Sequence, residues 1–221
     1  MGADAATRLP DAEATRRARA LGAAATLLAL GGIAAAVLLD PTFSWTSDAL
    51  SDLGVREASA PAFNWGLILG GAVGVGYAAD LGRTLDGRAV ALRATVLALA
   101  MVAMAGVGAF DLTEPLHGPS AIGFYALVTL LFAVDGVARW ASTTGQFALA
   151  FVPVHVAVWA TFLAGWWPVT GLALPELPGA LALAAWVWVL GPAPVLGSVA
   201  ARLDDVGVDG GGTDEVRTDE H

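Results

Sequence analysis

The chain has 221 residues, of which 57% are hydrophobic and only 14% are charged, and its mean hydropathy is +0.68. A soluble domain is typically about 45–50% apolar and about 25% charged, so this composition excludes an ordinary soluble fold. The formal net charge of −9 argues against nucleic acid as a partner, while the lack of cysteine excludes thiolate metal sites and the lack of lysine excludes a Schiff-base enzyme.

The hydrophobic residues fall into six blocks of about 20 residues, the length that crosses a hydrocarbon core about 30 Å thick. The sequence therefore predicts an all-α fold, a polytopic transmembrane bundle of six helices that forms one domain over residues 18–200. The predicted helices span residues 20–39, 61–79, 89–110, 119–137, 147–167 and 179–199.

The first block follows a polar, arginine-bearing segment over residues 1–17, which raises the alternative of a cleaved signal peptide. The block is longer than a typical signal sequence, and it ends in Asp40-Pro41 rather than at a small-residue cleavage site. We therefore predict a retained first helix after a cytoplasmic N-terminal segment.

Between the first two helices, polar side chains recur at three- and four-residue steps over residues 44–54, with leucines on the other side. This pattern predicts a short amphipathic helix on the outer face, which Gly54 ends. Two interpretations stay open. The helix is either a lid over the end of the bundle or part of a site that Ser51 and Asp52 line.

Helix two carries a polar amide and a stripe of small residues. Asn64 lies one turn into the helix, where an unsatisfied amide is costly, so we expect it to bond another helix or the outer segment, or else to line a pocket. Gly66, Gly70 and Gly74 recur at four-residue steps, a pattern that favours close packing against another helix.

The turn after helix three places three metal-capable side chains close together, because Asp111, Glu114 and His117 follow at i, i+3 and i+6. A solvated, capped turn is the alternative interpretation. A zinc ion shared with His155 is excluded by depth, since His155 lies roughly 18 Å further along its helix at 1.5 Å per residue, whereas zinc ligands lie about 2 Å from the ion.

His155 lies near the middle of helix five, close to Pro153. An ionisable side chain at membrane depth is a functional hypothesis unless it is paired, and Pro153 frees a backbone carbonyl nearby. The alternative is a histidine whose two ring nitrogens are both satisfied inside the bundle.

Arginines are concentrated on one side of the predicted membrane, and the opposite loops carry only Arg56. The positive-inside rule therefore places both termini in the cytoplasm of a plasma-membrane protein. On that side Asp135 and Arg139 (i, i+4) are interpreted as an interfacial ion pair. Residues 201–221 are rich in glycine and acids and are predicted to form a disordered tail, and the acidic, lysine-free composition is halophile-like.

The chain carries Leu50-Ser51-Asp52-Leu53-Gly54, then Phe63-Asn64-x-Gly66-Leu67-Ile68, then Gly108-x-Phe110 followed by an acidic turn that leads to His117. Over residues 20–200 this arrangement resembles the family known as domain of unknown function 998, whose members are polytopic prokaryotic membrane proteins. The resemblance implies that the Ser51, Asn64 and His117 elements lie together on the outer side. The family often has proline directly after Gly-x-Phe, where this chain has Asp111.

The leading hypothesis is a membrane protein whose first two outer loops form an outward-facing polar pocket for a lipid headgroup or a partner membrane protein. The predicted lining is Ser51, Asp52, Asn64, Asp111, Glu114, His117 and His155. The first alternative is a membrane-embedded hydrolase, metal-dependent or not, with His117, Asp111 and Ser51 as candidate catalytic residues. The second is a small proton-coupled transporter centred on His155. No cofactor, bound metal or nucleic-acid partner is predicted.

Overall fold

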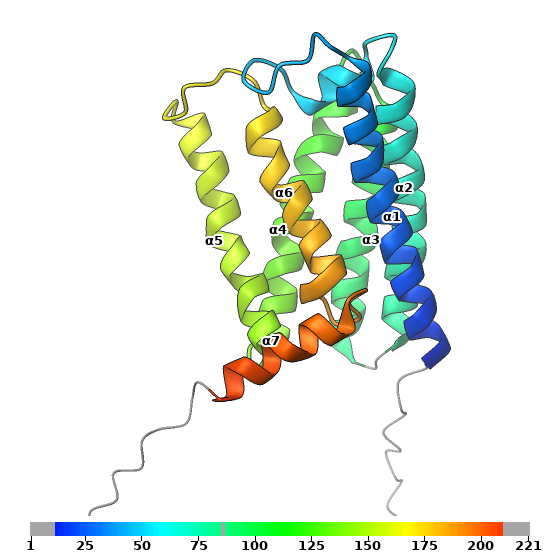
Figure 1. Cartoon of the computed structure of the whole chain (residues 1–221), viewed down its shortest axis with the longest axis vertical. Coiled ribbons are helices and arrows are strands. Elements are labelled where there is room, and N and C mark those ends of the chain that lie inside the picture. Colours follow the sequence, from blue (N-terminus) through cyan, green and yellow to red (C-terminus); the bar gives the residue numbers. More distant parts are fainter. Residues whose placement is uncertain (1–11, 85–86, 210–221) are drawn as a thin grey trace, which may run out of the picture.

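The computed structural model describes residues 12–84 and 87–209, and these residues form helices and loops without a strand. Six of the helices are long and apolar enough to cross a membrane, which confirms the predicted fold class (Figure 1). They are α1 (Ala12–Leu39), α2 (Ala60–Thr84), α3 (Arg88–Ala109), α4 (His117–Ala138), α5 (Thr143–Leu163) and α6 (Ala173–Ala185), which the π-helix η2 (Trp186–Leu190) continues.

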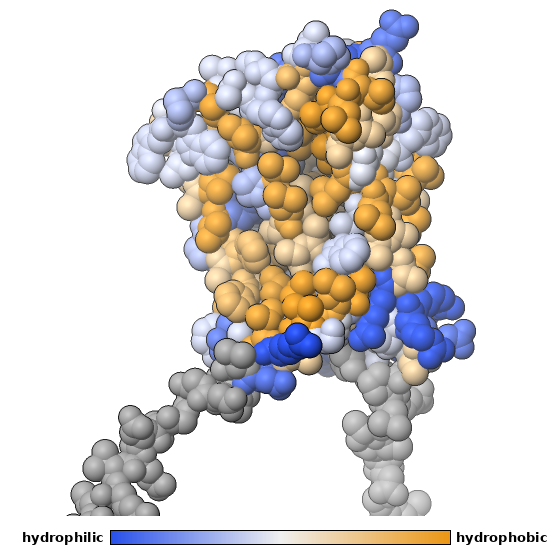
Figure 2. Space-filling model, in the orientation of Figure 1, coloured by the Kyte–Doolittle hydropathy of each residue, from blue (hydrophilic) through white to orange (hydrophobic). Residues whose placement is uncertain are grey.

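Apolar side chains cover the middle of the bundle, and hydrophilic ones gather at its two ends (Figure 2). Large hydrophobic residues are exposed on this band, including Leu99, Ile122 and Val156. A surface of this kind is stable in lipid and not in water, because each backbone polar group is satisfied inside a helix while the side chains contact hydrocarbon. The chain is therefore a multi-pass membrane protein.

The last helix, α7 (Gly197–Asp209), crosses one end of the bundle at the bottom of Figure 1. The Asp204 carboxylate attaches it, because its Oδ1 accepts a hydrogen bond of 2.8 Å from the Thr144 amide in the first turn of α5, where amides lack helical partners. The structure thus differs from the predicted disordered tail over residues 201–221, since helix continues to Asp209. Residues 210–221 lie outside the described part.

The sixth membrane helix begins and ends earlier than predicted, at Ala173 rather than 179 and at Leu190 rather than 199. Pro175 lies in the first turn of α6, where its missing amide hydrogen has no helical partner to lose. Gly191 and the prolines that follow it end the helix, because proline cannot continue the hydrogen-bond ladder.

The small residues of α2 contact two neighbouring helices instead of one. A Cβ on Gly66 would lie 2.8 Å from the Gly32 Cα of α1, and Gly70 likewise faces the α1 backbone. Gly74 faces Met101 of α3, because four-residue steps drift around a helix of 3.6 residues per turn. The predicted stripe therefore holds α2 between α1 and α3.

The segment between α1 and α2 forms only a short 3-10 helix, η1 (Leu50–Gly54), rather than an amphipathic helix over residues 44–54. The Asp48 carboxylate accepts the Ser44 amide at 2.9 Å, and the Asp52 carboxylate accepts the Ala49 amide at 2.7 Å. Such local side-chain bonds offer the backbone an alternative to a longer helix. We refer below to the η1 end and the α7 end of the bundle.

Candidate functional site

A narrow cavity of about 80 Å³ lies under η1, between α1, α2, α3, α4 and α6. On α2 its lining extends from Phe63 to Tyr77, which is roughly 21 Å along the helix at 1.5 Å per residue. Its walls are apolar, with residues such as Ala29, Leu67 and Met104. The cavity is therefore long and thin, and almost all of its surface suits hydrocarbon.

Six side chains on this apolar lining carry polar atoms. They are Thr26 of α1, Ser51 of η1, Tyr77 of α2, His117 and Tyr125 of α4, and Glu176 of α6. Ser51, His117 and Glu176 are each less than one-tenth exposed to solvent. The cavity is consequently amphipathic, and three of its polar groups gather on η1 and the first turns of α4 and α6.

Glu176 is the functional candidate that the sequence analysis missed. It lies in the first turn of α6, only 7% of it is exposed, and its Oε2 accepts a hydrogen bond of 2.8 Å from the Leu50 amide. Oε1 has no hydrogen-bond partner among the described residues and remains available to the cavity. The signal in the sequence is an acid between Leu174-Pro175 and Leu177 in an apolar run. This run falls between the predicted helices over residues 147–167 and 179–199, so Glu176 was not placed inside the bundle.

His117 begins α4, and its ring is oriented by the end of α3. Its Nδ1 lies 2.8 Å from the carbonyl oxygen of Phe110, the residue that follows the last turn of α3. A carbonyl oxygen only accepts, so Nδ1 carries the hydrogen, and in the neutral ring Nε2 keeps its lone pair. His117 thereby closes the α3–α4 turn and offers an acceptor to the cavity that it lines.

Asp52 and Asn64 hold η1 in place and do not line the cavity. The Asp52 carboxylate accepts the Ala49 amide, and the Asn64 side chain donates a hydrogen bond of 2.9 Å from Nδ2 to the Gly54 carbonyl oxygen. The Asp52 bond caps the start of η1, and the Asn64 bond attaches the end of η1 to α2. Both residues position Ser51 without contributing to the lining.

Asp111 and Glu114 lie on the α3–α4 turn outside the cavity. Asp111 accepts hydrogen bonds from the Thr113 hydroxyl and amide, which lower the pKa of its carboxyl group. Glu114 is exposed. Across the described residues, no group of three metal-capable side chains is close enough to hold a metal ion.

His155 is buried in α5, and both of its ring nitrogens are engaged. Trp159 donates from Nε1 to Nε2 at 3.2 Å, so Nδ1 carries the hydrogen that bonds the Thr129 hydroxyl at 2.8 Å. Thr129 in turn donates to the Tyr125 carbonyl oxygen. His155 is thus a satisfied histidine of the bundle interior, and it does not line the cavity.

The loop that carries η1 is fastened to the loop between α5 and α6. The Thr46 carbonyl oxygen accepts the amides of Thr170 at 2.9 Å and Gly171 at 3.0 Å, and the Asp48 carbonyl oxygen accepts the Ala173 amide at 2.9 Å. The two loops approach so closely that a Cβ on Gly171 would lie 2.3 Å from the Asp48 carbonyl oxygen. Together with the Leu50–Glu176 bond, these contacts hold η1 against the start of α6.

Arg56 fixes the other side of the same loop through ion pairs of 2.8 Å with Asp40 and 2.9 Å with Asp48. A hydrogen bond from the Thr42 hydroxyl, followed by the Arg56 interaction, lowers the pKa of Asp40 to about 2. The Asp40 carboxylate therefore stays ionised in any mildly acidic medium, and Arg56 stays occupied.

At the α7 end, the pair interpreted as interfacial is buried. Asp135 is fully buried, and it pairs with Arg139 of its own helix and with Arg93 of α3 at 3.0 Å. Trp186 of η2 donates to the same carboxylate at 2.7 Å. The Trp186 ring also contacts Tyr77, which lines the cavity. Trp186 and Tyr77 thus connect this charge cluster to the cavity.

Comparison with known proteins agrees with the resemblance in the sequence. The model of one protein family, described as protein of unknown function (DUF998), matches residues 23–193. No curated protein and no solved structure matches the chain. The matched range begins inside α1, ends just after η2, and contains the whole cavity lining. The chain therefore belongs to the DUF998 family.

Proposed function

We propose that the protein binds a lipid-like amphiphile, with its head group at Ser51, His117 and Glu176 and its hydrocarbon chain between the apolar walls. The observation that supports this function is the single cavity that combines a buried polar end with an apolar length of roughly 21 Å along α2. Ligand sites are mostly apolar concavities with a few placed polar groups. A cavity this narrow favours a lipid chain over a partner protein.

A hydrolase is the second candidate, because Ser51 and His117 line the same cavity. In that function His117 would activate the Ser51 hydroxyl as a nucleophile. The group that orients His117 is the Phe110 carbonyl rather than a carboxylate, and Asp111 and Glu114 lie outside. These contacts favour binding over catalysis. The engagement of both His155 nitrogens likewise gives no support to a proton-coupled transporter.

Filling the cavity will remove the bound lipid. Ala121→Phe places a ring in the cavity, whereas Ile122→Phe alters the next residue, whose side chain is 73% exposed and faces lipid. We expect lipid that copurifies with the wild type, quantified by mass spectrometry of the intact protein, to be lost from Ala121→Phe and retained in Ile122→Phe. Ala180→Leu, also on the lining, repeats the test with a smaller increase in volume. Equal lipid in all four proteins would contradict the proposed function.

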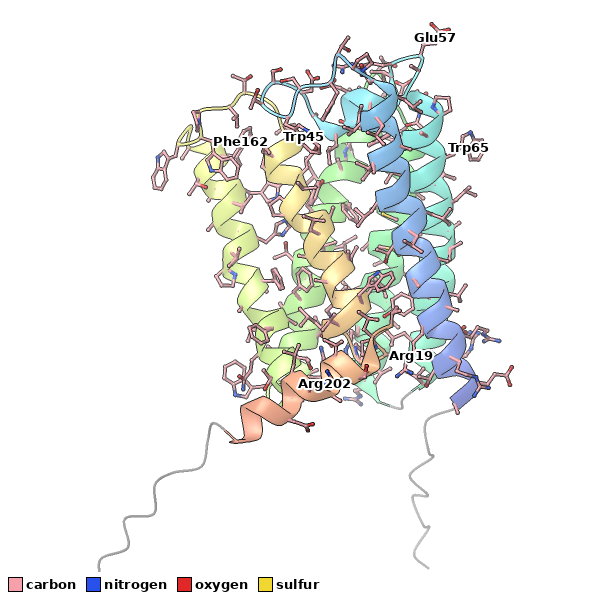
Figure 3. All side chains as sticks on the ribbon, in the orientation of Figure 1. Arg19, Trp45, Glu57, Trp65, Phe162 and Arg202 are labelled. Carbon is pink, nitrogen blue, oxygen red and sulfur yellow. The ribbon has the colours of Figure 1, made fainter. Side chains whose placement is uncertain are left out.

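We also propose that the protein lies in the plasma membrane with the η1 end outside and both termini in the cytoplasm. Arg19 and Arg202 lie at the α7 end, and Glu57 lies at the η1 end (Figure 3). Arg56, the arginine of the η1 end, is neutralised by two acids. The free positive charge therefore lies on the α7 side, as the positive-inside rule requires of a cytoplasmic face.

This orientation is testable because the chain has no cysteine. Single cysteines introduced as Glu57→Cys and Arg202→Cys occupy exposed positions at opposite ends of the bundle. We expect a membrane-impermeant maleimide to label Glu57→Cys in intact cells and to label Arg202→Cys only after the membrane is opened. The reverse labelling pattern would overturn the proposed orientation.

A further inference from the structure

We propose that the ligand is a single-chain amphiphile whose head group donates hydrogen bonds and carries no negative charge, with an ammonium preferred to a hydroxyl. The inference rests on the lipid-binding function proposed above and names its ligand class. It follows from the chemistry of the polar atoms at the cavity, the charges that surround Glu176, and the shape of the apolar part.

Two side chains at the η1 end of the cavity offer the ligand an atom that only accepts hydrogen bonds. Glu176 Oε1 accepts when ionised, and His117 Nε2 accepts because Nδ1 holds the ring hydrogen against Phe110. The hydroxyl groups of Ser51 and of the two tyrosines on the lining both donate and accept. A head group that brings hydrogens, such as an amine or an alcohol, satisfies these acceptors, whereas a phosphate or carboxylate brings further lone pairs.

The described part of the protein supplies no positive charge to balance an ionised Glu176. Glu176 forms no ion pair with any described residue, and the nearby charge that acts on it is a second acid, Asp52. The described lining contains no arginine, the chain has no lysine, and Arg56 is held by Asp40 and Asp48. A buried carboxylate is costly unless it is paired, so an ammonium on the ligand supplies the missing countercharge.

The apolar part fits one chain. One water molecule occupies about 10–15 Å³ of cavity volume on the same measure. The cavity has about 80 Å³, extended along α2, so it holds one slim hydrocarbon chain and not the two chains of a phospholipid. Small residues on the lining leave this room, among them Ala29, Ala121 and Ala180. The head-group atoms and the chain space belong to the same cavity, so one molecule occupies both.

The test uses the full-length protein in lipid nanodiscs and four probes with the same twelve-carbon chain: dodecylamine, dodecanol, laurate and dodecyl phosphate. Binding is measured by mass spectrometry of the intact complex, and Ala121→Phe reports the signal that comes from the surrounding lipid. A charge-assisted hydrogen bond is worth about 1.5–3 kcal/mol, so we expect dodecylamine to bind about tenfold or more tighter than laurate, with dodecanol between them.

Glu176→Gln isolates the carboxylate, since the amide oxygen of glutamine can still accept the Leu50 amide and preserve the fold. We expect this variant to lose the preference for dodecylamine over dodecanol while dodecanol affinity changes little. Glu57→Gln, an exposed acid at the same end, makes the identical charge change and should leave all affinities unaltered.

The outcomes separate this inference from the function on which it rests. Tightest binding of laurate or dodecyl phosphate, or an unchanged amine preference in Glu176→Gln, would overturn the proposed head-group class while leaving lipid binding intact. Failure of all four probes, together with equal copurifying lipid in the wild type and Ala121→Phe, would instead remove the proposed function.

Discussion

Replacing Gly32 by leucine will separate α1 from α2, while the same replacement at Gly31 will leave the bundle intact. A Cβ on Gly32 would lie 2.7 Å from both the Ala62 carbonyl oxygen and the Gly66 Cα. These are backbone atoms of α2, so no rotamer change can relieve the overlap and the whole helix must move. Gly31 is the matched control, because it is exposed and no atom lies within 4 Å of its Cβ position.

The expected cost of Gly32→Leu is at least about 3 kcal/mol, the top of the usual range for overpacking. The effect extends beyond the helix pair, because α1 and α2 both line the cavity. We therefore expect Gly32→Leu to aggregate on size-exclusion chromatography and to melt well below the wild type, with Gly31→Leu close to the wild type in both. Equal melting temperatures for the two variants would show that the α1–α2 contact does not limit stability.

The fold was predictable from composition, since six apolar blocks of membrane-spanning length have few arrangements other than a helical bundle. The ends of the sixth helix were not, because they depend on where proline falls in the helix. Pro175 is tolerated in the first turn of α6, whereas Pro192 lies beyond Gly191, the residue that follows η2. A hydropathy pattern shows that these prolines lie near an apolar run. The position of each proline in the helix decides whether the helix tolerates it or ends there.

The site was predictable in part. Ser51 and His117 line one cavity, as their shared family elements implied, but spacing along the chain could not show that Glu176 completes it. Its contact with Leu50 joins residues 126 apart in the sequence. Asp111 and Glu114 are close to His117 in the sequence but stay outside the cavity, because Asp111 bonds within its own turn and Glu114 is exposed.

The charge cluster at the α7 end could be seen only as a local pair. Asp135 and Arg139 are four residues apart on one helix, a spacing that usually marks a solvated ion pair. Arg93 comes from α3, and nothing in its local sequence links it to Asp135. Three elements had to be placed side by side before Asp135 could be recognised as the shared partner of two arginines and Trp186.

Asp135→Ala will therefore destabilise the protein far more than Asp80→Ala. Each aspartate is almost completely buried and pairs with two arginines. The arginines of Asp80 have side chains that are 56% and 65% exposed, so water solvates them once the acid is removed. The side chains of Arg93 and Arg139 are 5% and 18% exposed, so Asp135→Ala leaves two positive charges in the bundle interior.

Breaking a buried pair by removing one partner typically costs about 3–5 kcal/mol, whereas a solvated pair contributes about 1 kcal/mol or less. We expect this difference in the free energy of unfolding measured by denaturant titration in micelles. Arg93→Met separates charge from shape: it leaves Asp135 paired with Arg139, so its cost should fall well below that of Asp135→Ala. If Asp135→Ala and Asp80→Ala unfold alike, the interior at the α7 end must be hydrated enough to solvate Arg93 and Arg139.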